Sequence, residues 1–205
     1  MIVLYTYTQL EDYIKKLYAY LDINEPNNID INDIACKLDI RLKFWDEKSE
    51  ANFICGKFYI WLNKFLSKQE SWEEFGHELC HVLTHEGHQS YMKKQFLQYQ
   101  EIKAENFSLH FCVPTFMLLK YEIANYYNLK EGISFITELF NVTEDFARKR
   151  LIHFQNQIQQ AKSDEQHRKY MESLYRKAPP YSDETNSILH KLNILLEKKK
   201  KGVSL

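Results

Sequence analysis

Two histidines separated by three residues, with a glutamate directly after the first, occur in the segment His77-Glu78-Leu79-Cys80-His81. If the segment is helical, side chains four residues apart lie one turn from each other on one face, so both imidazoles can reach the same metal ion. Glu78 then lies beside the ion, where it can take a proton from water. This spacing is typical of zinc sites in metalloproteases. It also arises by chance on the order of a few per cent of the time in a chain with eight histidines, so the neighbouring residues must decide.

The neighbouring residues predict a helix over 72–86 that presents both histidines. Ser71 and Glu74 have the spacing of a capping box, and Gly87 is a natural end for the helix. At helical spacing, five apolar residues fall on one stripe: Trp72, Phe75, Leu79, Val82 and Leu83. His77 and His81 fall roughly opposite this stripe. The alternative is a solvated helix that happens to carry two histidines.

A third ligand is available on the next predicted helix. A catalytic zinc site needs three protein ligands and an open fourth position. The segment 98–113 has helical periodicity and ends before Pro114. Glu101 lies on this helix, with room for a loop and an antiparallel return after His81. Glu105, one turn further, is positioned to accept the second imidazole N–H of a liganding histidine. Taken alone, both acids are also what an exposed helix face carries.

With both segments in place, the chain resembles the ImmA/IrrE metallopeptidases. That family combines H-E-x-x-H with a downstream block E-x-x-A-(N/D/E)-x-F-A, which closes on M-P. Here the block runs over 101–108 and closes on Val113-Pro114, with serine for the usual alanine and valine for the usual methionine. Both departures leave the ligand positions unchanged. Segments 31–45 and 141–151 are similar as well, so the resemblance covers about residues 8–155.

The resemblance implies a gluzincin-like site in which His77, His81 and Glu101 hold Zn²⁺ and Glu78 is the catalytic base. It also implies a substrate class. Small stand-alone members of the family cleave helix-turn-helix repressors of prophages or mobile elements, which derepresses transcription. We therefore expect a zinc metalloendopeptidase with a protein substrate of this kind.

The oxyanion of the reaction also needs a hydrogen-bond donor. Four residues are near enough in sequence to qualify: Tyr91, Tyr99, His85 and His88. A surface position is the alternative for each of the two histidines. The sequence does not choose among the four.

The predicted fold class is α+β, a mostly helical metallopeptidase domain with a small antiparallel three-stranded sheet next to the H-E-x-x-H helix. Further helices are expected at 9–22, 30–38, 115–126, 132–140 and 144–159. Strands are expected at 41–45, 51–55 and 57–62, with Gly56 between the last two. Zinc peptidases commonly bind substrate as an added strand at a sheet edge. The run 57–63, with Tyr59, Ile60 and Trp61, is the candidate edge, and a buried strand is the alternative.

We expect two regions, a zinc metallopeptidase domain over 1–160 and a helical C-terminal extension over 161–205 that docks on the domain or binds a partner. At 44% hydrophobic residues, the chain can form one sizeable core. Its four cysteines form no C-x-x-C pair and are typical of a reducing compartment: Cys36, Cys55, Cys80 and Cys112. No signal sequence or membrane span is apparent, so we expect a cytoplasmic protein.

Two other functions are consistent with the sequence. A non-catalytic metal-binding antirepressor would act by binding the repressor, and its activity would survive Glu78→Gln but not replacement of the histidines. A DNA-binding protein is suggested by the helix over 30–38 and by the lysines at 198–201. A net charge of −1 gives no field that draws DNA, and the lysines are also what a solvated helix end carries. We therefore expect no direct nucleic-acid partner and no membrane partner.

Overall fold

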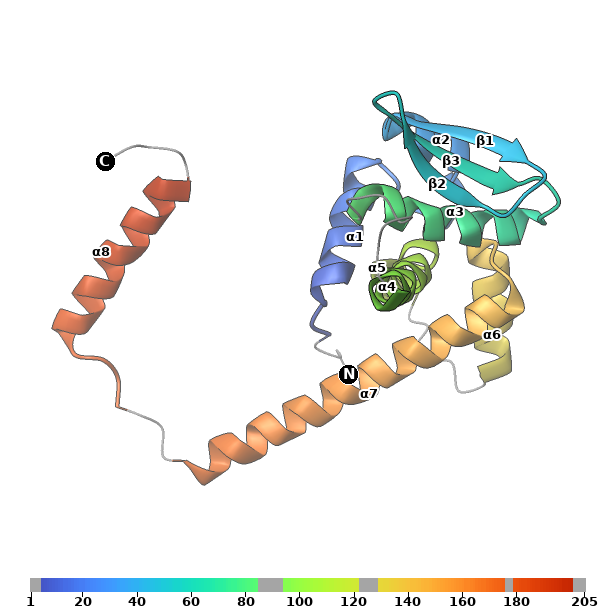
Figure 1. Ribbon diagram of the computed structural model, residues 1–205. Helices are drawn as coiled ribbons and strands as arrows, with labels where there is room; N and C mark the ends of the chain where they lie inside the picture. Colours follow the sequence, from blue (N-terminus) through green and yellow to red (C-terminus); the bar gives the residue numbers. More distant parts are fainter. Residues whose placement is uncertain (1–4, 85–93, 122–128, 176–178, 201–205) are drawn as a thin grey trace. The chain divides into compact units, whose positions relative to one another are not determined.

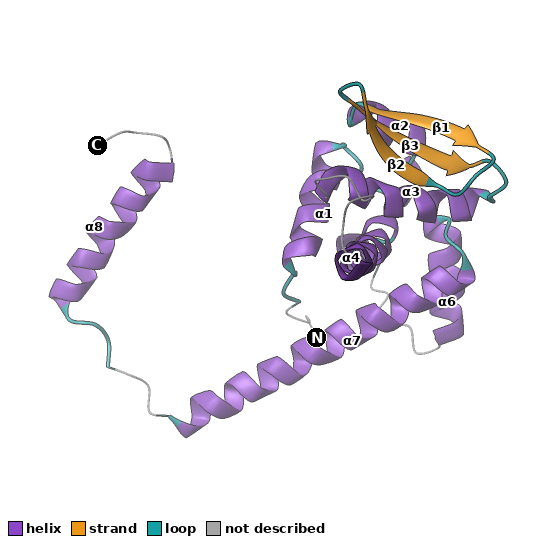
Figure 2. Cartoon of the chain, viewed as in Figure 1, coloured by secondary structure: helices purple, strands orange, loops and turns teal. Residues whose placement is uncertain are grey.

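The structure is a computed structural model that describes residues 5–84, 94–121, 129–175 and 179–200. In chain order its elements are α1 (Gln9–Tyr20), the 3₁₀ turn η1 (Pro26–Asn28), α2 (Ile31–Lys37), β1 (Ile40–Trp45), β2 (Glu50–Ile54), β3 (Lys57–Asn63), α3 (Lys68–Thr84), α4 (Lys94–Cys112), α5 (Thr115–Lys120), α6 (Leu129–Phe140), α7 (Glu144–Leu174) and α8 (Asp183–Lys200) (Figure 1). Figure 2 shows the strands together in one small sheet and helices elsewhere. The predicted class, α+β and mostly helical, is confirmed.

The sheet is mixed rather than antiparallel, with the strand order β1-β3-β2. β2 and β3 form an antiparallel hairpin, and its turn residues Cys55 and Gly56 both have positive φ, at 51° and 78°. A two-residue turn of this kind matches the twist of the flanking strands, and Gly56 adopts its φ without strain. β1 pairs with β3 in parallel, from Ile40 opposite Phe58 to Trp45 opposite Asn63. The expected all-antiparallel sheet is wrong because the turn fixes only the β2–β3 pair.

β3 is consequently the central strand, and the prediction of a substrate-binding edge at Tyr59, Ile60 and Trp61 is wrong. Ile60 and Leu62 are fully buried in the core beneath the sheet. Tyr59 and Trp61 alternate with them and stack on each other on the opposite face, with ring centroids 6.2 Å apart. β1 and β2 are the edge strands of this sheet.

The two helices of the metal site pack against each other beneath the sheet, with β2 and β3 over α3 (Figure 1). α3 begins four residues earlier than predicted. The capping box is formed by Ser67 and Glu70 instead of Ser71 and Glu74: the Ser67 amide donates to the Glu70 carboxylate at 2.8 Å, and the Glu70 amide donates to the Ser67 hydroxyl at 3.2 Å. Both pairs have the same spacing, so the sequence did not distinguish them.

The C-terminal end of α4 is held by side chains from α1 and α7. The Tyr18 hydroxyl donates to the Phe111 carbonyl at 2.7 Å, and Arg150 Nε donates to the Val113 carbonyl at 3.0 Å. Both side chains are fully buried. They satisfy carbonyls at a helix end where Pro114 has no N–H to continue the ladder.

A buried polar cluster lies beside this helix end. Arg150 Nη2 donates to the Thr115 hydroxyl at 2.7 Å, which donates to Glu11 Oε1 at 2.6 Å. His110 Nδ1 lies 3.5 Å from the Thr115 hydroxyl and 3.7 Å from the same Glu11 oxygen. Burial, followed by the Arg150 charge, lowers the pKa of His110 to about 3. The cluster thus ties α1, α4 and α7 together around a neutral imidazole.

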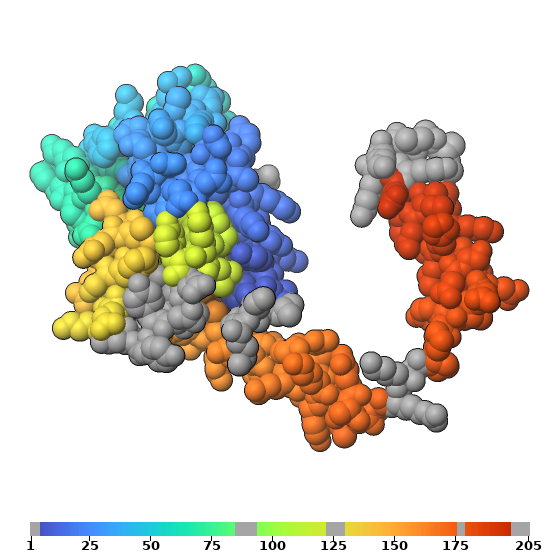
Figure 3. Space-filling view, turned by 180° about the vertical axis from the view of Figure 1, so that it is seen from behind, coloured from blue at the N-terminus to red at the C-terminus, as the bar shows by residue number. Residues whose placement is uncertain are grey.

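The chain divides into two compact units, Met1–Lys162 and Ser163–Leu205. In the first unit, α5 lies between the N-terminal helices and α6 (Figure 3). α7 is much longer than the predicted 144–159 and runs without a break through the boundary expected at residue 160, because the polar residues after Ala161 are still good helix formers. None of the helices within the described ranges has the length and apolar character needed to cross a membrane.

Candidate metal centre

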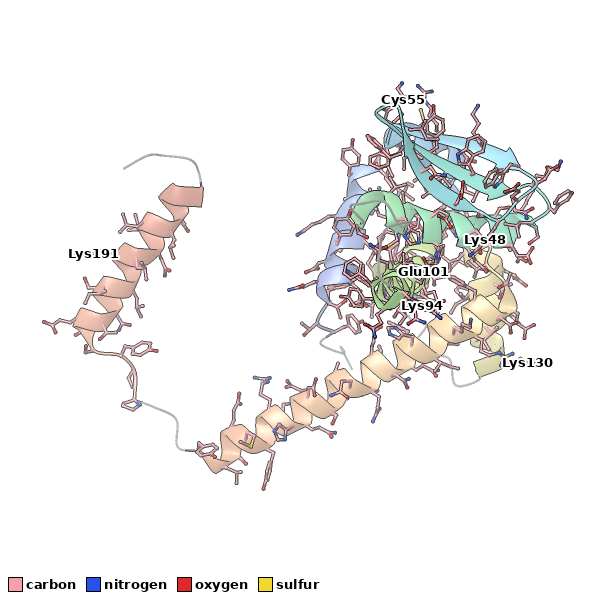
Figure 4. The ribbon with its side chains drawn as sticks, viewed as in Figure 1. Lys48, Cys55, Lys94, Glu101, Lys130 and Lys191 are labelled. Atoms are coloured by element: carbon pink, nitrogen blue, oxygen red, sulfur yellow. The ribbon has the colours of Figure 1, made fainter. Side chains whose placement is uncertain are left out.

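Three side chains from α3 and α4 converge on one point. His77 Nε2 lies 3.1 Å from Glu101 Oε2, and His81 Nε2 lies 3.6 Å from Glu101 Oε1. The two histidine Nε2 atoms are 3.2 Å apart. His77 and His81 are one turn apart on α3, and Glu101 lies where α4 passes next to that turn (Figure 4).

The spacing of these atoms fits a tetrahedral metal ion. Zinc binds imidazole nitrogen and carboxylate oxygen at about 2.0–2.2 Å, and two ligands of a tetrahedron at that radius are about 3.3–3.6 Å apart. The two imidazole nitrogens are 3.2 Å apart, and they lie 3.1 Å and 3.6 Å from the two different oxygens of the Glu101 carboxylate, all close to this range. Two imidazoles and one carboxylate are also the donor set of catalytic zinc sites, with one position left for water or substrate. The residues therefore fit a divalent ion of the zinc type.

The site is accessible to solvent from the Glu101 side. The Glu101 side chain is 45% exposed, compared with 22% for His77 and 9% for His81. Of the three side chains, Glu101 is therefore the one most open to solvent.

Glu78 is a buried carboxyl next to this cluster, with only 5% of its surface exposed. Burial, followed by the negative charges of Glu74 and Glu101, raises its pKa to about 8. The positive charge of Lys48 and the backbone amide of Ala51 act in the opposite direction. A carboxyl poised near neutral pH suits both halves of general acid–base work, accepting a proton and returning it.

The edge strand β2 borders the site. Ala51, in β2, is the residue whose amide lies at the Glu78 carboxyl, and Lys48 precedes β2 in the loop after β1 (Figure 4). β2 pairs with β3 on one side, and no strand of the described residues pairs with its other side. One of the two sheet edges, that of β2, therefore lies beside the predicted base, and the central strand β3 does not provide it.

Two further candidates from the sequence lie in the described residues, Glu105 and Tyr99, and neither joins the cluster. Glu105 is exposed, and the hydrogen bonds among the described residues include none from Glu105 to either histidine. Tyr99 is 55% exposed and, two residues before Glu101, points to nearly the opposite side of α4, where it lines a cavity with Val82, Leu83 and Lys103. The three further oxyanion candidates lie outside the described residues: His85, His88 and Tyr91.

Sequence reasoning missed two features of the site. One is the backbone amide of Ala51, which could not be predicted because backbone groups are the same at nearly every residue. The other is Gly76, directly before His77, which lies where α3 meets α4. A glycine in the middle of a helix is unfavourable on its own and usually marks a close approach, so this signal was present in the sequence.

The comparisons with known proteins agree with this geometry. The IrrE N-terminal-like domain, a family of peptidases (Peptidase_M78), matches residues 40–152. The phage-like element PBSX protein XkdA of Bacillus subtilis is 45% identical over 148 residues, which is 72% of this chain and 74% of XkdA. The uncharacterized protein YqaB of the same organism is 37% identical over 156 residues, which is 76% of this chain and 90% of YqaB. The matched region carries both helices of the metal centre, and the chain belongs to the IrrE-like peptidase family M78.

Proposed function

We propose that the protein is a zinc-dependent endopeptidase in which His77, His81 and Glu101 hold the metal ion. The observation that carries this proposal is the convergence of two imidazole nitrogens, 3.2 Å apart, on the Glu101 carboxylate, whose two oxygens lie 3.1 Å from His77 Nε2 and 3.6 Å from His81 Nε2. Membership of a peptidase family supports the reaction class. Residues 1–160 carry this activity in our proposal, and 161–205 form an extension that docks on the domain or binds a partner. The four free cysteines support a cytoplasmic location.

Glu78 is the general base and acid of the proposed reaction. When bound, zinc supplies a Lewis acid that polarises the peptide carbonyl and acidifies water. The Glu78 carboxylate takes the proton of the attacking water and delivers it to the leaving amine nitrogen. In the metal-free protein burial raises the pKa of Glu78 to about 8, and a raised proton affinity favours the first transfer.

The peptide substrate binds along the free edge of β2. The turn at Cys55-Gly56 makes Ile54 and Lys57 the closing hydrogen-bonded pair of the hairpin. Because peptide groups alternate in direction along a strand, Ala51 and Phe53 then direct their backbone groups away from β3. The Ala51 amide already lies at the Glu78 carboxyl. The Ala51 carbonyl and the backbone groups of Phe53 are available to an extended peptide, and the Ala51 position brings that peptide next to Glu78.

The proposed substrate is a helix-turn-helix repressor of a prophage or mobile element, whose cleavage derepresses transcription. The similarity to a protein of the phage-like element PBSX supports this setting. The test is to incubate the purified protein and Zn²⁺ with the repressor encoded beside it and to identify products by mass spectrometry. Glu78→Gln should bind zinc but leave the repressor intact. If the wild-type protein also leaves it intact while it cleaves unstructured peptides, the repressor is excluded and the peptidase is not.

The same variant separates catalysis from the alternative of a non-catalytic antirepressor. If Glu78→Gln still relieves repression in cells while cleaving nothing, the metal centre serves binding instead of hydrolysis. Loss of both properties in Glu78→Gln supports the peptidase.

A further inference from the structure

The helix that carries both histidines, α3, has a glycine, Gly76, where it packs against side chains of α4. A Cβ added at Gly76 would lie 2.7 Å from Cys112 Sγ, 3.1 Å from Ser108 Oγ and 3.5 Å from a ring carbon of Phe111. The first separation is shorter than any ordinary carbon–sulfur contact. Gly76 has no positive φ that would itself require glycine. Its use here is therefore the close approach of the two helices.

The side chains of α4 that face Gly76 are fixed in place. The Ser108 hydroxyl donates to the Glu73 carbonyl at 2.9 Å, which is also the carbonyl that accepts the His77 amide in a regular helix. Cys112 is fully buried, and its thiol donates to the Trp72 carbonyl at 3.5 Å. The serine and the sulfur cannot both retreat from an added methyl group unless α4 moves away from α3.

Movement of α4 would displace the third ligand. Glu101 and Ser108 are seven residues apart, which is two helical turns and places them on the same face of α4. Ser108 contacts the residues just before His77, and Glu101 contacts His77 and His81 themselves. The two contacts lie on one rigid helix, so its distance from α3 at Gly76 sets the distance of the Glu101 carboxylate from both imidazoles.

We infer that Gly76 is a positioning residue of the metal centre, which fixes the separation of α3 and α4 and with it the fit of Glu101 to the two histidines. This inference rests on the proposed zinc site. The required fit is narrow, since ligand distances in a metal site hold to about ±0.2 Å. Relieving the contact from 2.7 Å to an ordinary separation needs a larger shift than that.

The test is a zinc titration of metal-free protein against a chromophoric chelator, with four variants beside the wild type. Gly76→Ala should weaken zinc binding about 10- to 100-fold, the range seen when the groups supporting a metal ligand are disturbed. Cys112→Ala removes the atom in the closest contact and should bind zinc as the wild type does. The double variant Gly76→Ala/Cys112→Ala should return to within about threefold of Cys112→Ala, because the two changes are coupled through one contact. Gly132→Ala adds a methyl group to another buried helical glycine, in α6, and should leave zinc binding unchanged.

A merely structural role for Gly76 predicts a different result: Gly76→Ala lowers the melting temperature but keeps the zinc affinity of the wild type, and that result overturns the inference. If Gly76→Ala does not fold, the double variant decides alone, and weak zinc binding by a folded double variant also overturns it. If the wild-type protein binds no zinc, the proposed function fails as well. Normal binding by the wild type together with normal binding by Gly76→Ala removes only the role of Gly76.

Discussion

The backbone amide of Ala51, in the edge strand β2, lies at the carboxyl of Glu78, in the helix α3. The strand proposed to bind the peptide and the carboxyl proposed to transfer its protons are therefore adjacent. In the hairpin register, the backbone groups of Phe53 point to the same outer side of β2 as those of Ala51.

Phe53→Pro should lower kcat/KM for a peptide substrate about tenfold relative to Phe53→Ala, because proline removes an N–H from the free edge. The alanine variant is the control, since both changes remove the ring that contacts Phe58 at 4.7 Å. Thermal unfolding should change little between the two variants, because proline is tolerated at outward positions of edge strands. Equal kcat/KM values for the two variants would exclude this edge as the binding strand.

Glu101→Gln should lose zinc affinity by at least tenfold, because an amide is a poorer ligand than a carboxylate. Glu105→Gln is the matched control, one turn along the same helix and exposed. We expect it to bind zinc as the wild type does, because Glu105 is exposed and makes no hydrogen bond to either histidine in the described residues. Metal content after dialysis, measured by elemental analysis, checks both. A large loss in Glu105→Gln with none in Glu101→Gln would reverse the roles of the two acids.

Glu78→Gln should stabilise the metal-free protein at pH 7.5 on the order of 1 to 3 kcal/mol. At this pH the unfolded chain has an ionised Glu78, so folding must either bury that charge or bind a proton, and both cost free energy. The folded pKa of about 8 lies above the unfolded value of 4.5, so the penalty is absent well below pH 4.5 and grows as the pH rises toward 8. Urea unfolding in the presence of a chelator, at pH 4 and pH 7.5, measures it. A variant that is less stable than the wild type at pH 7.5 would contradict the prediction.

His110→Gln should flatten the loss of stability in acid. The folded pKa of His110, about 3, lies below the unfolded value of 6.5, so stability is complete above pH 6.5 and declines as the pH falls toward 3. Glu11 acts in the same direction: although burial alone raises its pKa, hydrogen bonds from Thr115, Tyr5 and Thr8 lower it overall. The wild type should therefore lose up to about 1.4 kcal/mol per pH unit more than His110→Gln between pH 6 and 4. Parallel curves from urea unfolding with a chelator would show that His110 does not titrate on unfolding.

The sequence predicted what helical periodicity encodes and missed what depends on pairing between segments. His77, His81 and Glu101 were assigned from spacing within two helices, and the structure brings their ligand atoms together. The position of β1 could not be predicted from such spacing, because alternating apolar residues do not indicate which strand β1 pairs with or in which direction. For the same reason the edge strand was predicted at Tyr59, in β3, whereas the structure has it at Ala51, in β2. The capping box was shifted by one turn because Ser67 and Ser71 are each followed by a glutamate three residues later.

The buried side chains of Tyr18 and Arg150 hold α4 at its C-terminal end, through the Phe111 and Val113 carbonyls, whereas Glu101 lies in its N-terminal half. α4 is one continuous helix between these hydrogen bonds and Glu101, so a shift of its C-terminal end also shifts Glu101 relative to α3. If the hydrogen bonds of Tyr18 and Arg150 were lost, the position of the Glu101 carboxylate, more than two helical turns away, would become less well defined. The precision of the proposed zinc site therefore depends also on Tyr18 and Arg150, although neither is one of its ligands.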